Sequence, residues 1–199
     1  SLRCVDMVMT QDNLDPTENL KKIHDQFENA ELTLVFGSDW KKVPGGASVL
    51  RLTRQAADWQ TAGGQAVDFR HVRGASTVYN CAGITTAWGT VLSSEENPLN
   101  AEDLMKYRVE FPQLSGNPLD YGWVVEIDPV NATALRKLEA LGRFSHEGIA
   151  ILPDRRTVFL GDDDVQGVLF KFVAEASSDL SRGTLYAFRR DTTQWLPIQ

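Results

Sequence analysis

Short apolar segments, broken at close intervals by glycine, proline and aspartate, are the feature that most constrains how this chain folds. From Glu31 to Gly37, apolar and polar residues alternate, which is typical of a half-buried strand. The same reading predicts strands at residues 47–52, 122–128, 148–152, 157–160, 167–173 and 183–189. Because the long crossover helices that a parallel sheet needs are absent from this pattern, we expect an all-β protein of antiparallel strands, either a β-propeller or a sandwich.

Two helices are expected beside these strands. Asp15-Pro16-Thr17-Glu18 has the composition of a helix start, and apolar residues then recur at helical spacing, which predicts a helix near residues 16–29. Asn100 followed by two acidic residues predicts a second helix at about 101–107. We therefore divide the chain into an N-terminal segment, residues 1–40, with a helix and the first strand, and a propeller-like domain at 41–199.

Composition narrows the classes of function. The chain has 199 residues, of which 42% are hydrophobic, and a net charge of −7, which are ordinary values for a soluble globular protein. Without clustered Lys and Arg, no nucleic-acid partner is expected, and the acidic balance fits a protein that binds cations. No stretch approaches the roughly 20 apolar residues of a membrane span. Residues 1–10 lack the pattern of a signal peptide, so the chain is either cytoplasmic or a processed or truncated form.

The segment from Asn80 to Asn97, NCAGITTAWGTVLSSEEN, carries the densest chemistry. It places Cys81, a Gly/Thr-rich turn, a tryptophan and the pair Glu95-Glu96 within a single strand-and-loop length. Thiolate sulfur suits a transition metal, and carboxylate oxygen suits calcium or iron. Because Glu and Asp are seldom buried unless they are paired or bound to metal, this segment indicates a metal site.

Two further segments end a strand-like run with acidic residues beside glycine. They are Leu141 to Gly148, LGRFSHEG, and Leu160 to Asp164, LGDDD. Carboxylates at several strand ends can converge on one axis, where cations would have to neutralise their repulsion. The alternative for each segment alone is a solvated turn, but three segments of the same design favour metal binding.

Taken in order, these motifs resemble those of the PhoX-type alkaline phosphatase family. The family's patterns are Cys-Ala-Gly-Gly, Trp-Gly-Thr with a Glu-Glu pair, a Trp-Val-Val strand that ends in Asp-Pro, Gly-Arg-Phe-x-His-Glu, Gly-Asp-Asp, and Gly-Thr-Leu-Tyr before Trp-Leu-Pro. The matching segments run from about Lys41 to the C-terminus: CAG, WGT, SSEEN, YGWVVEIDP, LGRFSHEG, GDDD, LFKFV, GTLYAFRRD and WLPIQ.

The resemblance implies a β-propeller that binds iron (Fe3+) and calcium at its axis and hydrolyses phosphate monoesters, that is, phosphorylated small molecules. Carried over by motif, Cys81 would be the thiolate ligand of an iron, and Glu96 and Glu147 would also ligate metal. Asp163 is the preferred ligand from Gly-Asp-Asp, with Asp162 as the other choice. The resemblance also implies a periplasmic or secreted location.

Several positions depart from the family's pattern. Ile84 stands in place of the second glycine of Cys-Ala-Gly-Gly, Ala87 in place of a proline, and Ser94 in place of a residue that is often Cys. The family's later Arg-Pro-Glu motif is not found. Residues 148–189 have the size of one propeller blade, and at about 40–45 residues per blade this chain makes four or five. We therefore expect a partial or small propeller, either a fragment or a shortened relative.

Two alternatives stay open at this point. One is a non-catalytic propeller module that binds calcium or a partner protein and keeps only part of the metal site. The other is a calcium-dependent, lactonase-like propeller hydrolase, which would not use a cysteine. Beside the candidate ligands, His146 is either a buried structural residue or a group that orients a ligand carboxylate. Arg143 is either a phosphate binder or, more in keeping with a strand motif, a surface pairing residue.

Overall fold

A computed structural model describes residues 3–4, 31–38, 45–55 and 58–198. Within them the strands form three sheets, all of their pairings antiparallel except the one between β1 and β2. The helix predicted near residues 16–29 lies outside the described residues, and the division of the chain at residue 40 stays a prediction. No helix in the described part is long and apolar enough to cross a membrane.

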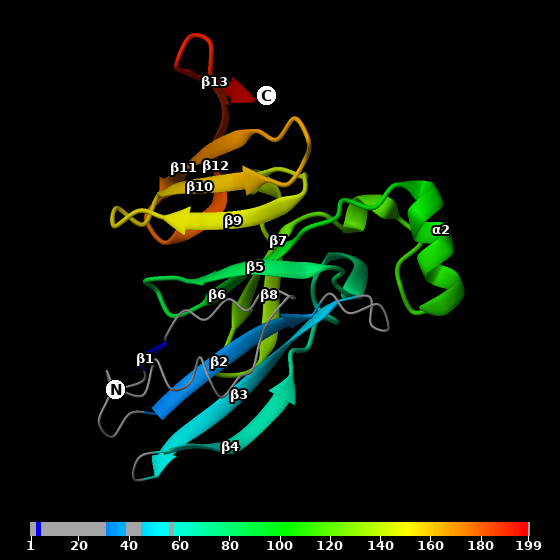
Figure 1. Cartoon of the computed structure of the whole chain (residues 1–199), viewed down its shortest axis with the longest axis vertical. Helices are drawn as coiled ribbons and strands as arrows, with labels where there is room; N and C mark the ends of the chain where they lie inside the picture. Colours follow the sequence, from blue (N-terminus) through cyan, green and yellow to red (C-terminus); the bar gives the residue numbers. More distant parts are fainter. Residues whose placement is uncertain (1–2, 5–30, 39–44, 56–57, 199) are drawn as a thin grey trace.

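The three sheets follow one another along the chain and lie stacked in the same order (Figure 1). The N-terminal sheet has the order β1 (Arg3–Cys4), β2 (Glu31–Ser38), β3 (Gly46–Gln55), β4 (Asp58–Ala66). The middle sheet contains β5 (Asn80–Thr85), β6 (Val91–Glu95), β7 (Val124–Asp128) and β8 (Thr133–Lys137). The C-terminal sheet contains β9 (His146–Ile151), β10 (Thr157–Asp162), β11 (Leu169–Ala176), β12 (Asp179–Arg189) and β13 (Gln194–Ile198).

The predicted all-β architecture is confirmed, and apart from the parallel β1 the sheets have the up-and-down order of propeller blades. The described residues form three such sheets, where the chain length predicts four or five blades. The blade expected at residues 148–189 is the C-terminal sheet, with β13 added at its edge. The helix expected at 101–107 is α2 (Ala101–Glu110), whose N-cap Asn100 accepts a hydrogen bond from the Asp103 N–H. Three short 3-10 helices complete the described elements: η1 (Arg73–Ala75), η2 (Pro118–Asp120) and η3 (Glu139–Leu141).

Apolar residues on both faces of the middle sheet hold the stack together. In β7, Val125 and Ile127 pack with Val49 of the N-terminal sheet. Val124, which points to the other face, packs with Val158 of the C-terminal sheet. All of these side chains are buried, so the middle sheet is covered on both sides and its strands are apolar in consecutive positions.

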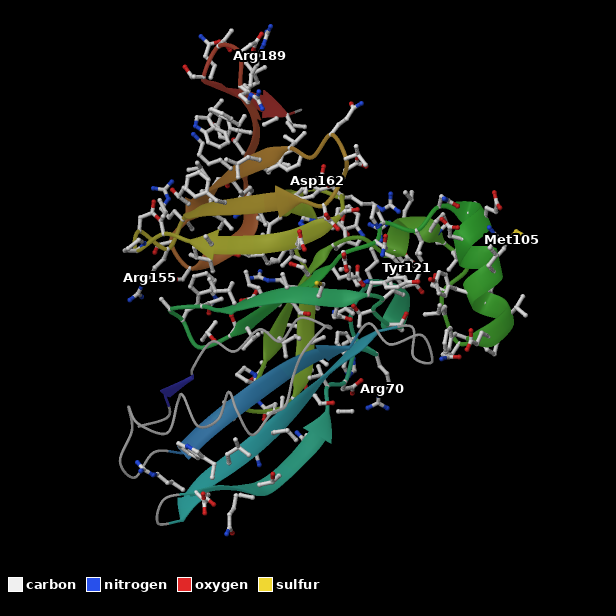
Figure 2. The ribbon with its side chains drawn as sticks, viewed as in Figure 1. Arg70, Met105, Tyr121, Arg155, Asp162 and Arg189 are labelled. Atoms are coloured by element: carbon white, nitrogen blue, oxygen red, sulfur yellow. The ribbon has the colours of Figure 1, made fainter. Side chains whose placement is uncertain are left out.

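The first strand of the middle sheet, β5, lies between the other two sheets. β5 contacts β2 on one side and β9 on the other. In Figure 1, β5 and β9 run side by side and begin at the same end of the sheets, the right end in this view. Figure 2 shows Asp162 at that end of the C-terminal sheet and Arg155, in the β9–β10 hairpin, at the opposite end. This arrangement brings motifs that are far apart in the sequence to one end of the molecule.

Candidate functional site

The middle and C-terminal sheets contain the same irregularity near the beginning of their first strand. In the middle sheet Asn80 pairs with Glu95 and Gly83 with Ser93, so β5 has one residue more than β6 between these pairs. In the C-terminal sheet His146 pairs with Asp162 and Ile149 with Leu160, which gives β9 one extra residue in the same way. Each extra residue is a β-bulge, a feature that occurs often next to active sites.

The bulges place the predicted ligands at equivalent positions of the two sheets. Cys81 and Glu147 each directly follow the paired residue at the beginning of the bulge. A backbone hydrogen bond of 2.9 Å closes each strand end, from the Glu96 N–H to the Tyr79 carbonyl and from the Asp163 N–H to the Ser145 carbonyl. Glu96 therefore corresponds to Asp163, and Glu95 corresponds to Asp162.

These side chains differ in their access to solvent. Cys81, Glu96 and Asp162 are half-buried, whereas Glu147 and Asp163 are exposed. Among the described residues, no group of three or more His, Cys, Asp or Glu side chains is placed so as to hold a metal ion. The described residues thus present a thiol and carboxylates, which are ligand types that suit iron and calcium, without assembling a complete coordination shell.

Glu95 has a structural role that is distinct from that of its neighbour. Its fully buried carboxylate forms an ion pair of 2.8 Å with Lys137. It also accepts hydrogen bonds from the Thr77 hydroxyl and from the N–H groups of Val78, Gly122 and Trp123, at 2.7–3.2 Å. A buried charge with this many donors is compensated in place and has no need of a metal ion.

Lys137 completes the network on the other side. Its ammonium group donates to Glu95 and to the Asp120 carbonyl, at 2.8 and 2.6 Å, and lies 5.0 Å from the centre of the Tyr121 ring. Burial lowers the pKa of Lys137, and the attraction of the Glu95 carboxylate opposes that shift. The pair therefore connects β6, the end of β8 and the segment that leads into β7.

The Trp-Gly-Thr motif lies away from the bulges. It belongs to the hairpin between β5 and β6, so the segment from Asn80 to Asn97 forms two strands rather than a single strand and loop. Trp88 Nε1 and the Thr90 hydroxyl both donate to Glu126, at 2.9 and 2.8 Å. Arg136 forms an ion pair of 2.8 Å with the same carboxylate. The tryptophan therefore stabilises the hairpin and does not face the candidate ligands.

Arg143 anchors the segment between β6 and β7. Its guanidinium group donates to the carbonyl oxygens of Tyr121, Leu99 and Pro118, at 2.7–3.1 Å. Burial lowers the pKa of Arg143. Because its donors are directed at backbone carbonyls, the geometry favours neither surface pairing nor phosphate binding, the two roles considered from the sequence.

His146 is fully buried at the beginning of β9. Its Nε2 lies 2.9 Å from the Gly142 carbonyl, and its ring packs against Phe144 with 3.7 Å between the ring centres. Burial lowers its pKa to about 4. These contacts favour the structural role for His146, although it directly precedes the candidate ligand Glu147.

The three aspartates at the end of β10, Asp162 to Asp164, lie in different environments. Asp164 caps a turn, since its carboxylate accepts a hydrogen bond from the Gln166 N–H and its carbonyl accepts one from the Gly167 N–H. The solvated-turn alternative therefore describes Asp164. Asp162 and Asp163 are placed by the pairing with β9 described above.

Comparison with known proteins places the chain in a family. The family description "Alkaline phosphatase PhoX" matches residues 28–199. The chain belongs to the PhoX alkaline phosphatase family. No match was found among curated proteins.

A solved structure of a PhoX protein is similar to this one. It is Pseudomonas fluorescens PhoX in complex with vanadate, a transition state analogue, with 26% sequence identity and a TM-score of 0.59. The alignment covers 77% of this chain and 40% of that protein, so this chain spans less than half of that PhoX protein.

Sequence reasoning missed the residues that organise the strand ends. From the sequence, Glu95 is grouped with Glu96, although Glu95 is fully buried against Lys137 and Glu96 is half-buried beyond the end of β6. Lys137 belongs to β8, Thr-Ala-Leu-Arg-Lys, which ends in two basic residues and so lacks the alternation of apolar and polar residues that predicts a strand. No local signal separates Glu95 from Glu96, because residues 92–96 read Leu-Ser-Ser-Glu-Glu and do not alternate between apolar and polar.

Proposed function

We propose that this chain forms part of a metal-dependent hydrolase of phosphate monoesters, similar to an alkaline phosphatase. The observation that carries the proposal is the equivalence of the two strand ends, where Cys81 and Glu96 in the middle sheet correspond to Glu147 and Asp163 in the C-terminal sheet. Membership of the PhoX alkaline phosphatase family and the vanadate complex of its P. fluorescens relative support the same reaction.

In this proposal the bulge residues and the ends of the second strands supply part of the metal ligands. Cys81 provides the thiolate for iron, and Glu96, Glu147 and Asp163 provide carboxylate oxygens for iron or calcium. The equivalence with Glu96 favours Asp163 over Asp162 as the ligand, because Asp162 corresponds to the structural Glu95. Cations bound there would neutralise the charge of the phosphate and of the departing oxygen.

The side chains of this chain limit the mechanism in two ways. Glu95 is held by Lys137 and four further donors, so it is unavailable as a base or ligand. His146 stays neutral over the pH range in which an alkaline phosphatase works, because its pKa is lowered to about 4. No reaction step is therefore assigned to either residue.

The proposal is tested by p-nitrophenyl phosphate hydrolysis on protein supplied with iron and calcium, together with elemental analysis of the same sample. Wild-type protein is expected to retain both metals and to turn over the substrate. Cys81→Ser is expected to lose iron and activity, whereas Cys4→Ser, the change at the other cysteine of the sequence, is the matched control. Unchanged iron and turnover in Cys81→Ser would contradict the assignment.

A second candidate function is favoured because the described residues do not assemble a complete coordination shell. A module that binds calcium or a partner protein without catalysis would keep exposed carboxylates such as Glu147 and Asp163 but would need no iron. Calcium retention without iron and without hydrolysis in the experiment above would select this candidate.

A further inference from the structure

The buried Glu95 network reaches the residue next to Cys81. We propose that Thr77, Glu95 and Lys137 are positioning residues, which fix the β5 bulge and the backbone of Glu96 relative to each other. This inference rests on the proposed function, since it assigns a role toward the Cys81 and Glu96 site. In this inference, Thr77, Glu95 and Lys137 do not bind metal or substrate themselves.

A continuous path of hydrogen bonds joins the charge pair to the bulge. Lys137 donates to Glu95, which accepts a bond of 2.7 Å from the Thr77 hydroxyl. The same hydroxyl oxygen accepts a bond of 2.9 Å from Asn80 Nδ2. Asn80 directly precedes Cys81, and its side chain is further held by the Ser93 hydroxyl and the Gly46 N–H. The buried charge pair is thus connected to the beginning of the bulge.

The same network holds the backbone at Glu96. Glu96 directly follows Glu95, the last residue of β6, so a fixed Glu95 holds the chain from which the Glu96 side chain leaves. The Glu96 N–H donates to the Tyr79 carbonyl at 2.9 Å, which attaches the end of β6 to the residue before Asn80. Tyr79 has a φ of +47°, which is uncommon for a residue with a side chain and must be maintained by its surroundings.

The equivalent position of the C-terminal sheet provides a contrast. Asp162 corresponds to Glu95, but it is half-buried, and the hydrogen bonds and ion pairs of the described residues do not include its carboxylate. The bulge itself therefore forms without such a network. The network of the middle sheet is an additional constraint on the strand end that carries Cys81.

The inference is tested through the reactivity of the Cys81 thiol, which requires neither substrate nor metal. In metal-free protein that carries Cys4→Ser, Thr77→Val removes the hydroxyl that links Glu95 to Asn80. We expect iodoacetamide to alkylate Cys81 about fivefold faster than in the parent protein, because the loss of one buried hydrogen bond favours local opening of the bulge. Thr77→Ser, which keeps the hydroxyl, is expected to restore the parent rate.

A matched control is available at the other end of the C-terminal sheet. The Thr157 hydroxyl donates to the Asp154 carboxylate at 2.6 Å, so Thr157→Val makes the same substitution at an exposed threonine–carboxylate bond away from the bulges. Thr157→Val is expected to leave the alkylation rate of Cys81 unchanged. Equal rates in Thr77→Val, Thr157→Val and the parent would overturn the inference, as would a Thr77→Ser rate as high as that of Thr77→Val.

Hydrogen exchange supplies a second readout. The Glu96 amide, bonded to Tyr79, is expected to exchange faster in Thr77→Val, whereas amides of β11 keep their rates. Asn80→Ala interrupts the same path at its next member, the residue directly before Cys81. This variant replaces Thr77→Val in the experiment if Thr77→Val does not fold. Failure of phosphate hydrolysis in the wild-type chain would contradict the proposed function alone, while an unchanged thiol rate and Glu96 exchange would contradict only the positioning role.

Discussion

The middle and C-terminal sheets have the same bulge near the beginning of their first strand but stabilise it by different means. At the middle sheet, a buried carboxylate with five donors connects β6, β8 and the segments before β5 and β7. At the C-terminal sheet, the equivalent residue Asp162 is half-buried, and the bulge begins with a buried, neutral His146 packed on Phe144. The backbone pattern therefore does not depend on one set of side chains.

The two strand ends also lead into connections of different length. The second and third strands of the C-terminal sheet are joined by the short turn of residues 163–168, whereas residues 96–123 of the middle sheet contain α2 and η2. Figure 1 shows α2 standing away from the sheets at the end where β5 and β9 begin. The long segment returns through Gly122 and Trp123, whose N–H groups donate to Glu95. The additional constraint thus occurs in the sheet that carries the long insertion.

The largest effect is expected from Lys137→Met. This change leaves the Glu95 carboxylate buried without its cation, and breaking one side of a buried ion pair costs about 3–5 kcal/mol. Urea unfolding measures the loss in the free energy of unfolding. Lys106→Met removes an exposed ion pair with Glu102 and is expected to cost less than about 1 kcal/mol. A loss as small as that of the control would mean that the network contributes little to the middle sheet.

In the C-terminal sheet, the buried His146 is expected to make the free energy of unfolding depend on pH. His146 has a pKa of about 4 in the folded protein and 6.5 as its reference value, so the unfolded chain binds the proton first as the pH falls. The stability contributed by the neutral, buried ring is present above pH 6.5 and is lost between pH 6.5 and about 4, on the order of 3 kcal/mol.

Unfolding of metal-free protein at several pH values measures this effect. His146→Asn, which introduces the residue found at the equivalent position of the middle sheet, is expected to show a smaller slope of stability against pH in that window. His71→Gln, at an exposed histidine, is the control. The same slope in wild-type protein and His146→Asn would contradict the burial of a neutral ring.

Glycine-to-alanine substitutions compare how well the strand ends of the middle and C-terminal sheets accommodate an added Cβ atom. Gly122 has a φ of +90°, and an added Cβ would lie 2.6 Å from Pro98 Cβ. Gly161, in β10, has ordinary backbone geometry, with its nearest neighbour 3.6 Å from an added Cβ. We expect Gly122→Ala to cost about 2 kcal/mol and Gly161→Ala less than about 1 kcal/mol in thermal unfolding. Equal costs would remove this distinction between the sheets.

The smallest loss of stability is expected in the long segment between β6 and β7, residues 96–123, which contains α2. Asn100 caps α2 through a hydrogen bond of 2.9 Å from the Asp103 N–H. Asn100→Ala is expected to destabilise the helix by about 1 kcal/mol. Hydrogen exchange is expected to accelerate in the first turn of α2 and to remain unchanged in β6, because the lost cap bond lies within the helix end. Acceleration in β6 of the same size would indicate that the insertion and the strand end unfold together.

Much of the fold could be predicted from the sequence, because most strands show an apolar face. The strands that include Val125 and Phe172, and the helix capped by Asn100, were found in this way. β4 was missed because its sequence, Asp-Trp-Gln-Thr-Ala-Gly-Gly-Gln-Ala, has few apolar residues and its side chains are largely exposed. Its place depends on its hairpin with β3, in which Gln55 pairs with Asp58 and Ser48 with Ala66, and the apolar pattern of β4 alone does not show this pairing.

The candidate site was predictable only in its residue types. The motifs around Cys81 and Glu147 showed that a thiol and carboxylates end strand-like runs. The bulges were not predictable, because a bulge is a property of two strands in register rather than of one segment. The separate roles of Glu95 and Glu96 also required the structure, since only the position of Lys137 shows which of the two is compensated.

The central claim is that Cys81 and Glu147 occupy equivalent bulges and contribute to one site. Its most direct test is the metal content, by plasma mass spectrometry, of Cys81→Ala, Glu147→Gln, the double variant and Glu175→Gln, an exposed carboxylate of β11 used as the control. The account predicts that each single variant loses bound metal, that the double variant loses little more than the more severe single one, and that Glu175→Gln keeps the wild-type content. Wild-type metal content in both single variants would contradict it.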